Sequence, residues 1–407
     1  MGNRRIGSGI ALFVSLASAP AARAFEIPDF ELVYTQPVET SLRAKDLRPP
    51  RVVWLQLIRS AQKTIDLEQM YAVSEAGEPL EGVIDALEEV GRRGVKIRFL
   101  LEKKMLRASD PPTIERLKRL PGIEFQATDF AKLVKHDGII HAKFMIIDGV
   151  RAYMGSQNFD WRSLKHVHEL GVKIEDPTIA GQMQSIFNHD WTNQRRLSEG
   201  REPREWEPDE GGKEPVCEEG RAVRLVASPP GHLPPCVGPS EAALVKLLDS
   251  AKSEIRVQVM SYSPLMHRKQ PYRPIDDAIR AAAARGVKVR LLVANWSTEK
   301  PAIDLLKDLS KVENVQIRVV TIPPAKQGFI PFARVIHSKY CVVDGKTAWV
   351  GTSNWEGGYL NQSRNLELIV DDARFAERVR ALHDQLWESI YAEDLQLDKV
   401  YPKIHRE

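Results

Sequence analysis

The chain carries the same pattern of charged residues twice, and this duplication limits the folds that it can adopt. Residues 141–148 read HAKFMIID and residues 337–344 read HSKYCVVD, so that His, Lys and Asp recur at the same offsets 196 positions apart (337 − 141 = 196). The match continues along the chain, to paired glycines and asparagines, paired tryptophans and paired apolar runs: GSQN (155–158) and GTSN (351–354), Trp191 and Trp387, RRGVKIRFLL (92–101) and ARGVKVRLLV (284–293). An internal duplication of a unit of roughly 190 residues explains these matches, and chance does not.

Each copy alternates segments that have helical and strand-like spacing of apolar residues. In the first copy, VVWLQLIRSAQ (52–62) and LEGVIDALEEVGRRG (80–94) have the spacing of helices, whereas VKIRFLL (95–101) and KFMIID (143–148) are strand-like. This alternation predicts the α/β class, with two similar α/β/α units whose sheets are of mixed direction. We expect the units to pack about a pseudo-twofold axis, with one active site shared between them.

The length of 407 residues leaves room for two ordinary domains, and composition marks the ends of the units. The first unit is expected at residues 25–196 and the second at residues 222–407. Between them, residues 197–221 are rich in Arg, Glu, Gly and Pro, which is typical of a linker.

The first 24 residues have the pattern of a cleaved export signal. A basic start, MGNRR, precedes the apolar run IGSGIALFVSLASA (6–19), and ARA (22–24) provides small residues for cleavage after Ala24. The alternative is an uncleaved anchor, but the run is shorter than the roughly 20 residues that a spanning helix needs. We therefore expect a secreted or periplasmic protein without stable membrane insertion.

The three cysteines fit an exported protein. Cys217 and Cys236 lie 19 positions apart in a segment rich in Pro and Gly, where a disulfide would clamp the linker. Cys341 lies inside the second repeated motif, where a strand would bury it as a small apolar residue. The spacings CxxC and HExxH do not occur, so the sequence predicts no metal site and no cofactor.

The repeated polar residues have the chemistry of a phosphate site. On an extended strand, residues i and i+2 point the same way, so His141 and Lys143 share a face, as do His337 and Lys339. An ammonium group can hold a phosphoryl oxygen, and an imidazole can attack phosphorus or donate a proton. Four further candidates could donate hydrogen bonds to phosphate oxygens, namely Asn158, Asn354, Ser156 and Ser353.

A need for two histidines would explain the duplication. Displacing an alcohol from a phosphodiester takes a nucleophile on one side and an acid on the other, and two facing units would supply one imidazole each. Glu169 and Glu367 lie on the strands that follow and are expected to orient these imidazoles, as a carboxylate does in a catalytic triad. Asp148 and Asp344 complete the two motifs, close each strand at its turn, and count among the candidate catalytic residues.

These residues resemble the motifs of the phospholipase D superfamily, and the resemblance covers nearly all of the chain after the export signal. The two HxKxxxxD motifs with GSQN and GTSN carry it, and phrases such as IPFARVIHSKY (330–340) and VGTSNWEGGY (350–359) are similar to the branch of lysosomal phospholipase-D-like proteins and their poxvirus relatives. The resemblance implies that His141 attacks phosphorus to form a phosphohistidine, and that His337 is the acid and then the base. It implies that Lys143, Lys339, Asn158 and Asn354 bind the phosphate, without a metal.

The sequence leaves two substrate classes open. Single-stranded nucleic acid is the first, because aromatic residues near the motifs could stack bases: Phe159, Trp161, Trp355, Tyr359, Trp296 and Tyr262. Basic residues could line the approach: Lys103, Lys104, Arg107, Lys135, His267, Arg268 and Lys269. The alternative is a phospholipase D or transphosphatidylase that acts on glycerophospholipids, but no conspicuous membrane-seeking segment supports it. A binding protein without activity is disfavoured because both motifs are complete.

Overall fold

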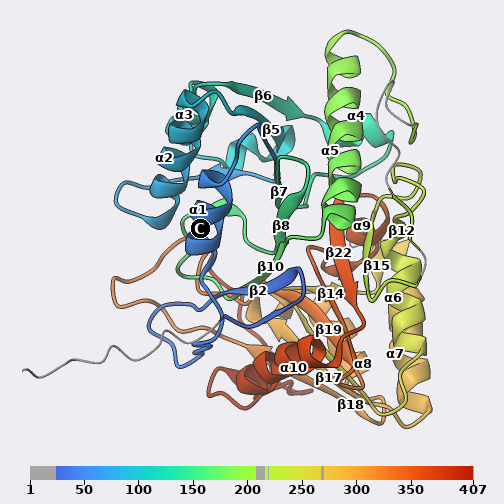
Figure 1. Ribbon diagram of the computed structural model, residues 1–407. Coiled ribbons are helices and arrows are strands. Elements are labelled where there is room, and N and C mark those ends of the chain that lie inside the picture. Colours follow the sequence, from blue (N-terminus) through green and yellow to red (C-terminus); the bar gives the residue numbers. More distant parts are fainter. Residues whose placement is uncertain (1–23, 208–215, 219, 267–269, 407) are drawn as a thin grey trace, which may run out of the picture.

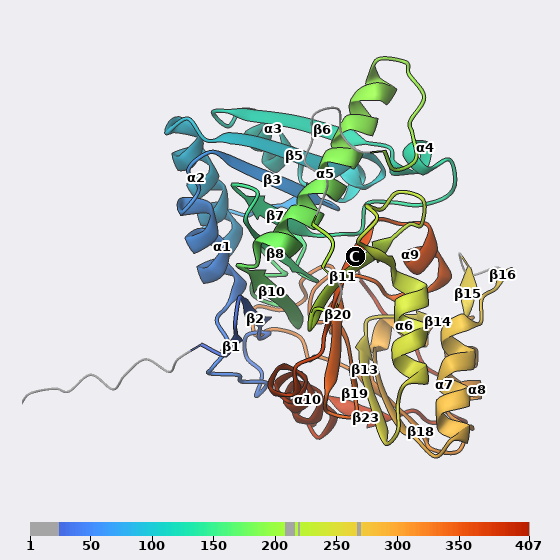
Figure 2. The ribbon, with the colours of Figure 1, turned by 45° about the vertical axis from the view of Figure 1, so that its right-hand side comes forward.

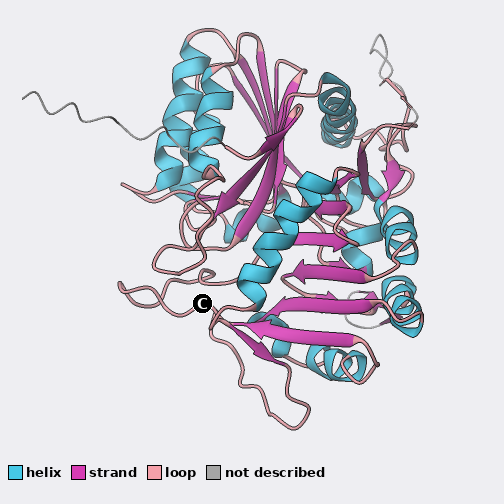
Figure 3. Cartoon of the chain, turned by 60° about the horizontal axis from the view of Figure 1, so that its bottom comes forward, coloured by secondary structure: helices cyan, strands magenta, loops and turns pink. Residues whose placement is uncertain are grey.

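The computed structural model describes residues 24–207, 216–218, 220–266 and 270–406 (Figure 1). The predicted export signal therefore lies outside the described residues, apart from Ala24. The described chain forms two large sheets, and helices flank each of them (Figure 3).

The first half contains ten strands, five α-helices and one 3-10 helix. They are β1 (Glu26–Ile27), β2 (Phe30–Thr35), α1 (Pro50–Arg59), β3 (Thr64–Gln69), β4 (Ala72–Val73), α2 (Pro79–Arg92), β5 (Lys96–Glu102), η1 (Lys103–Ala108), α3 (Pro111–Lys118), β6 (Ile123–Thr128), α4 (Phe130–Val134), β7 (Phe144–Ile147), β8 (Arg151–Gly155), β9 (Phe159–Asp160), β10 (Glu169–Ile174) and α5 (Pro177–Ser198).

The second half repeats this order with small additions. Its described elements are β11 (Val223–Ser228), β12 (Gly238–Pro239), α6 (Ser240–Asp249), β13 (Glu254–Val259), β14 (Tyr262–Ser263), β15 (Leu265–Met266), β16 (Gln270–Pro271), α7 (Pro274–Ala284), β17 (Lys288–Ala294), η2 (Asn295–Thr298), α8 (Ala302–Leu309), β18 (Val315–Val320), β19 (Lys339–Val343), β20 (Thr347–Gly351), β21 (Trp355–Glu356), α9 (Gly357–Asn361), β22 (Asn365–Val370), α10 (Ala373–Trp387) and β23 (Ala392–Asp394).

The two sheets share the order of seven strands and differ at their edges. The first runs β1-β2-β10-β8-β7-β3-β5-β6 and the second runs β12-β11-β22-β20-β19-β13-β17-β18-β23. In the first sheet β3, β5 and β6 are parallel, whereas β7, β8, β10 and β2 pair antiparallel. The corresponding strands of the second sheet pair in the same way. The predicted α/β class with mixed sheets is thus confirmed.

Local sequence explains why equivalent helices begin at equivalent positions. The Asp176 carboxylate caps α5 by accepting hydrogen bonds from Thr178 N and Ile179 N. Asp372 caps α10 in the same way, through Arg374 N and Phe375 N, and lies 196 positions later (372 − 176 = 196). An aspartate at this position satisfies backbone N–H groups that a helix start leaves unpaired.

A large apolar core joins the two halves. It contains buried residues from one face of each sheet, such as Phe144 and Val172 in the first and Tyr340 and Leu368 in the second. Helices α5 and α10 contribute to the same core, and Figure 2 shows α5 running beside the first sheet. Because the halves share this core, residues from both can form one rigid site.

The predicted disulfide is present between Cys217 and Cys236, with a Cα–Cα distance of 5.2 Å. Cys217 lies within the expected linker, residues 197–221, and Cys236 lies after it. Helix α5 extends to Ser198, two residues into the same segment. Cys341 is buried and unpaired in β19, as predicted. Among the described residues, no helix is both long enough and apolar enough to cross a membrane.

Candidate active site

The two repeated motifs meet where the halves contact each other. His141 N donates a hydrogen bond to Arg364 O (3.0 Å), and His337 N donates one to His168 O (2.8 Å). These contacts are reciprocal, because 141 and 337 are 196 apart and so are 168 and 364. The pseudo-twofold axis predicted from the duplication therefore relates the two histidines to each other.

Each imidazole is held at Nδ1 by a residue of the opposite half. His141 Nδ1 lies 2.8 Å from Asn365 Oδ1, and His337 Nδ1 lies 2.9 Å from Glu169 Oε2. Both oxygens accept hydrogen bonds, so each Nδ1 carries the proton and Nε2 is the nitrogen left to react. Glu169 and Asn365 are equivalent positions of the duplication (169 + 196 = 365).

The prediction that Glu367 orients a histidine is wrong. Its buried carboxylate accepts hydrogen bonds from Ser353 Oγ (2.5 Å) and from Ser240 Oγ. Glu367 corresponds to Gly171, two positions beyond Glu169, and its side chain lies against Gly351, where a Cβ atom would meet Glu367 Cγ at 2.1 Å. Glu367 matches Glu169 in residue type, whereas the constant offset of 196 identifies Asn365 as the counterpart of Glu169.

Asp148 and Asp344 have a structural position rather than a catalytic one, which corrects the prediction for both. Asp148 accepts hydrogen bonds from the backbone N–H groups of residues 62–64, at 2.7 to 3.2 Å. Asp344 does the same for residues 252–254. Each stands after the far end of its strand and fixes the loop that leads into the neighbouring strand.

Lys143 and Lys339 lie in the site as predicted and are almost fully buried, at 2% and 1% exposure. Each ammonium group donates to the backbone oxygen of the histidine two residues earlier. Burial lowers the pKa of Lys339 to about 7, against the opposing effect of Glu169. Burial and the charge of Lys339 lower the pKa of Lys143 well below its usual value. Two buried cations that destabilise each other form a natural anion site.

The asparagines fit the predicted role better than the serines do. Asn354 is fully buried, and its Nδ2 donor has no partner among the described residues, while its Oδ1 accepts from Ser261 N (3.3 Å). A buried donor without a partner is costly unless a ligand oxygen satisfies it. Asn158, buried at 6% exposure, holds the equivalent position in the first half.

Ser156 and Ser353 are not equivalent positions of the duplication, and both hydroxyls form hydrogen bonds within the protein. Ser156 Oγ bonds to the backbone of Leu170 (3.0 and 3.1 Å), next to Glu169. Ser353 Oγ donates to Glu367. The counterpart of Ser156 is Thr352, whose Oγ1 donates to Asn365 Oδ1 (2.8 Å) and so helps to hold the partner of His141.

Burial also sets the protonation of the histidines. Desolvation, together with the charges of Lys143 and Lys339, lowers the pKa of both His141 and His337 well below 6.5. Desolvation raises the pKa of Glu169 to about 8. At neutral pH the Glu169–His337 pair therefore holds one proton more than a carboxylate and a neutral imidazole would hold, so that His337 can donate a proton from Nε2, whereas His141 is a neutral imidazole.

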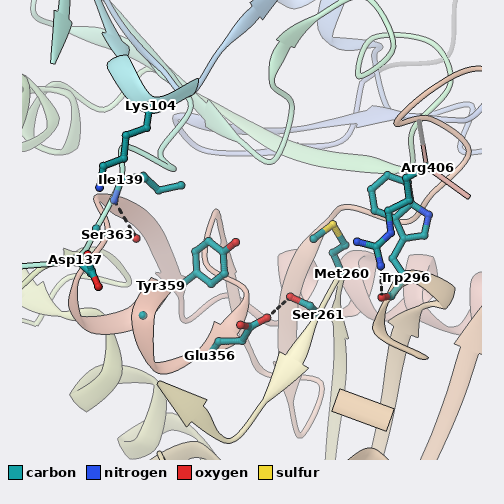
Figure 4. Close-up of a pocket in the computed structure, with 12 residues that line it drawn as sticks. Lys104, Asp137, Ile139, Met260, Ser261, Trp296, Glu356, Tyr359, Ser363 and Arg406 are labelled. Carbon is teal, nitrogen blue, oxygen red and sulfur yellow. Dashed lines mark hydrogen bonds between the residues drawn. The ribbon is translucent and has the colours of Figure 1, made fainter. Parts of the chain in front are cut away.

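A cavity of about 420 Å³ adjoins His141 (Figure 4). The ring of Tyr359 forms its wall next to the histidine, with the two ring centroids 4.6 Å apart. Of the six aromatic residues proposed to stack bases, Tyr359 and Trp296 line this cavity, while Phe159, Trp355 and Tyr262 are fully buried in the core and Trp161 is 7% exposed.

Among the described basic residues proposed to line the approach, Lys103, Lys104 and Arg107 are exposed. Lys104 lines the cavity, whereas Lys135 forms an ion pair with Glu202 (3.2 Å). His267, Arg268 and Lys269 lie outside the described residues.

Comparison with known proteins agrees with this geometry. A family model described as "Cardiolipin synthase, PLD-like domain" matches residues 54–191 and again residues 244–387, once in each half. The chain belongs to this PLD-like family. Membership, together with the relatives below, identifies it as a hydrolase of the phospholipase D superfamily that acts on phosphodiesters.

Two curated relatives and one solved structure show the range of the family. The chain is 31% identical to "5'-3' exonuclease PLD3" of Rattus norvegicus, over 84% of this chain and 75% of the relative. It is also 31% identical to "Probable phospholipase D F09G2.8" of Caenorhabditis elegans, over 84% of this chain and 66% of the relative. The phosphatidylserine synthase of Haemophilus influenzae superposes with a TM-score of 0.63 over 91% of this chain and 88% of that one; at 11% identity it supports the fold alone.

Proposed function

We propose that the protein is a metal-independent exonuclease that hydrolyses single-stranded nucleic acid through a phosphohistidine on His141. The observation that carries the proposal is the reciprocal pair of imidazoles, each held at Nδ1 from the opposite half. With Lys143, Lys339 and the two asparagines around a phosphate, one Nε2 can face phosphorus from each side of it.

The reaction then has two displacements. His141 Nε2 attacks phosphorus and forms the P–N bond, while the P–O bond to the leaving alcohol on the opposite side breaks and His337 Nε2 gives its proton to that oxygen. Water next loses a proton to His337 Nε2 and attacks phosphorus, which breaks the P–N bond and releases a phosphate monoester. His337 ends the cycle protonated, as it began.

The asymmetry of the orienting groups supports this assignment of roles. The Glu169 carboxylate favours the imidazolium form of His337, which an acid and base must pass through. The neutral Asn365 amide holds His141 in one tautomer without adding a negative charge. A bound phosphodiester anion would offset the two ammonium groups and raise the fraction of His337 that carries a proton.

Nucleic acid is favoured over phospholipid by the cavity next to the site. Aromatic side chains and four charged ones, Lys104, Asp137, Glu356 and Arg406, line it. Bases stack on aromatic rings, and sugars and bases offer hydrogen bonds to charged groups. Burying acyl chains against four charged side chains would instead be unfavourable. The name of the rat relative, a 5'-3' exonuclease, supports the same choice and suggests attack from the 5′ end.

We also propose that the protein is exported and cleaved near Ala24. The support is the basic and apolar pattern of residues 1–24 and the disulfide between Cys217 and Cys236, a bond typical of oxidising compartments. Sequencing the N-terminus of protein secreted by an expressing cell tests this. A mature start at Phe25 supports export, and intact protein retained in the cytoplasm contradicts it.

The substrate is tested by measuring initial rates on a 5′-hydroxyl single-stranded oligonucleotide and on phosphatidylcholine vesicles, each at two ionic strengths. We expect the oligonucleotide to be hydrolysed faster, with a KM that rises with salt because lysines neutralise phosphates. A variant with His141→Asn is the control for contaminating nucleases. Turnover of phosphatidylcholine with an untouched oligonucleotide would replace this proposal with the phospholipase D alternative.

A further inference from the structure

The cavity beside His141 exists on one side of a site that is otherwise duplicated. Its residues Glu356, Gly358 and Tyr359 correspond to Asp160, Arg162 and Ser163 of the first half, at the constant offset of 196. Ser261, whose hydroxyl donates a hydrogen bond to Glu356, corresponds to Tyr71 at the offset of 190 that relates β3 to β13. The two sides of the scissile phosphate therefore have the same backbone and different side chains.

On the first-half side, large side chains occupy the corresponding positions and bind one another. Tyr71 Oη donates to Asp160 (3.0 Å), and the Arg162 guanidinium bonds to the same carboxylate (2.8 to 3.0 Å). Trp161 packs on His166 with the ring centroids 5.5 Å apart. On the second-half side, the small residues Ser261 and Gly358 leave that volume open, and the aromatic ring of Tyr359 lines it (Figure 4). The same ring lies 4.6 Å from the His141 ring, centroid to centroid.

The far wall of the cavity is formed by the C-terminal segment. The Arg406 guanidinium lies over the Trp296 ring, 5.1 Å from its centroid, and donates to Trp296 O and to the Glu299 carboxylate, both at 2.9 Å. Arg406 O accepts a hydrogen bond from Phe332 N (2.8 Å), and His405 stacks on Phe329. These contacts hold the segment against Trp296, across the cavity from Tyr359 (Figure 4).

The size and lining of the cavity suit a single nucleoside. Its volume of about 420 Å³ is within the roughly 300–1,000 Å³ of small-molecule sites. Tyr359 and Trp296 offer ring faces for a base, and Glu356 and Asp137 offer acceptors for sugar hydroxyls or base amino groups. Two acidic and two basic side chains line the cavity, so its lining has no net positive charge to hold a second phosphate, which favours an end of the chain over an internal stretch.

We propose that this cavity is a subsite for one terminal nucleoside, with its base between Tyr359 and Trp296, and that the wall at Arg406 stops the chain from passing further. The proposal rests on the nuclease function above and adds to it the structural reason for attack at an end. The remaining chain leaves over the first-half side, where Tyr71, Trp161 and Arg162 occupy the equivalent volume.

The sharpest test gives the second half the first-half residue. Ser261→Tyr replaces the hydroxyl that donates to Glu356 with a phenol, just as Tyr71 donates to Asp160, and narrows the cavity while keeping the backbone N–H that holds Asn354. Trp296→Ala removes one stacking face, and Trp296→Phe is the matched control that keeps it. Each variant is assayed on a linear single-stranded oligonucleotide, on a single-stranded circle of the same length, and on methyl 4-nitrophenyl phosphate, which carries no nucleoside.

We expect Ser261→Tyr and Trp296→Ala to raise KM for the linear oligonucleotide, the second by roughly 5- to 150-fold, the loss of one base stack. Trp296→Phe should stay near wild type, and methyl 4-nitrophenyl phosphate should be hydrolysed equally by all variants. The wild type should degrade the linear chain and leave the circle intact.

Two results would overturn the subsite while the nuclease function stands. One is cleavage of the circle at a rate comparable to the linear chain, and the other is unchanged KM for the linear chain in both cavity variants. If the wild type hydrolyses the small phosphodiester and no nucleic acid, the proposed function fails and the subsite falls with it.

Discussion

The two catalytic histidines differ in the single residue that holds each Nδ1. A carboxylate, Glu169, holds His337, and an amide, Asn365, holds His141. The duplication supplied two equivalent positions, and different residue types at them separate the roles of the imidazoles. A carboxylate partner favours the protonated ring, and an amide partner favours the neutral one.

Glutamine substitutions at the two predicted glutamates distinguish their roles. We expect Glu169→Gln to lower kcat by roughly 10²- to 10⁴-fold, because His337 loses the charge that stabilises its imidazolium form. Glu367→Gln should keep kcat within about threefold of wild type, since Glu367 contacts serines and burial raises its pKa to about 7, so that a neutral side chain suits its site. Steady-state kinetics with matched melting curves measure both. An equal loss of kcat in the two variants would show that Glu367 takes part in catalysis.

The motif aspartates, Asp148 and Asp344, stabilise the fold rather than take part in catalysis. Asp148→Ala should destabilise the fold by about 1–3 kcal/mol, because three backbone N–H groups lose their acceptor, with little change in kcat. Burial raises the pKa of the Asp148 carboxyl, but the backbone hydrogen bonds outweigh it, so that the net shift is downward.

The sign of this shift adds a pH dependence to the same experiment. A depressed pKa in the folded state means that the stabilisation is complete above the ordinary pKa of aspartate and is lost as pH falls through the folded value. Urea unfolding at neutral and at acidic pH should therefore show a smaller difference between wild type and Asp148→Ala in acid. A constant difference, or a large loss of kcat in folded protein, would contradict the structural role.

Among the elements, a buried ion pair ties the residue that precedes β22 in the second half to α5 of the first. Arg364 and Asp190 are fully buried, with two hydrogen bonds of 2.6 and 2.8 Å. Arg364 also donates to Ser228 O and His232 O and presents its backbone oxygen to His141 N. The same residue thus joins the packing of the halves to the position of a catalytic histidine.

Arg364→Met should destabilise the protein by about 3–5 kcal/mol, because it leaves the Asp190 carboxylate buried without its partner. The double variant Arg364→Met with Asp190→Leu should regain part of that loss, since no charge is left uncompensated. Denaturant unfolding of the two variants measures the difference. A double variant no more stable than the single one would show that the pair is not the source of the effect.

The sequence predicted most of the elements and less of the site. The repeated offset of 196 and the alternation of apolar residues were enough for the mixed sheets, the shared site and the placement of His141, His337, Lys143 and Lys339 together. Asn365 was missed because glutamates were matched by type, although the offset from Glu169 points to it. Spacing alone could not separate Tyr359 and Trp296, which line the cavity, from Trp355 and Phe159, which the core buries.

At the scale of the whole molecule, the site is built from groups that do not favour a metal cation. Two imidazoles and two ammonium groups surround the phosphate position, and its carboxylate, Glu169, is bound to His337. Hard cations prefer several oxygen ligands. After the protein has been dialysed against EDTA, it should therefore still hydrolyse the oligonucleotide in the presence of excess EDTA. Loss of activity that one divalent ion restores would contradict this.

The central claim is that one active site uses one histidine from each half in different roles. The most direct measurement compares wild type, His141→Asn and His337→Asn in single-turnover reactions with a ³²P-labelled oligonucleotide, with thermal melts to confirm folding. We expect both variants to lose turnover by at least about 10³-fold, given the usual size of acid, base and nucleophile contributions. Acid-labile label should be found on His141 in wild type and be absent from His141→Asn. Near-normal turnover in either folded variant, or label on His337, would contradict the account.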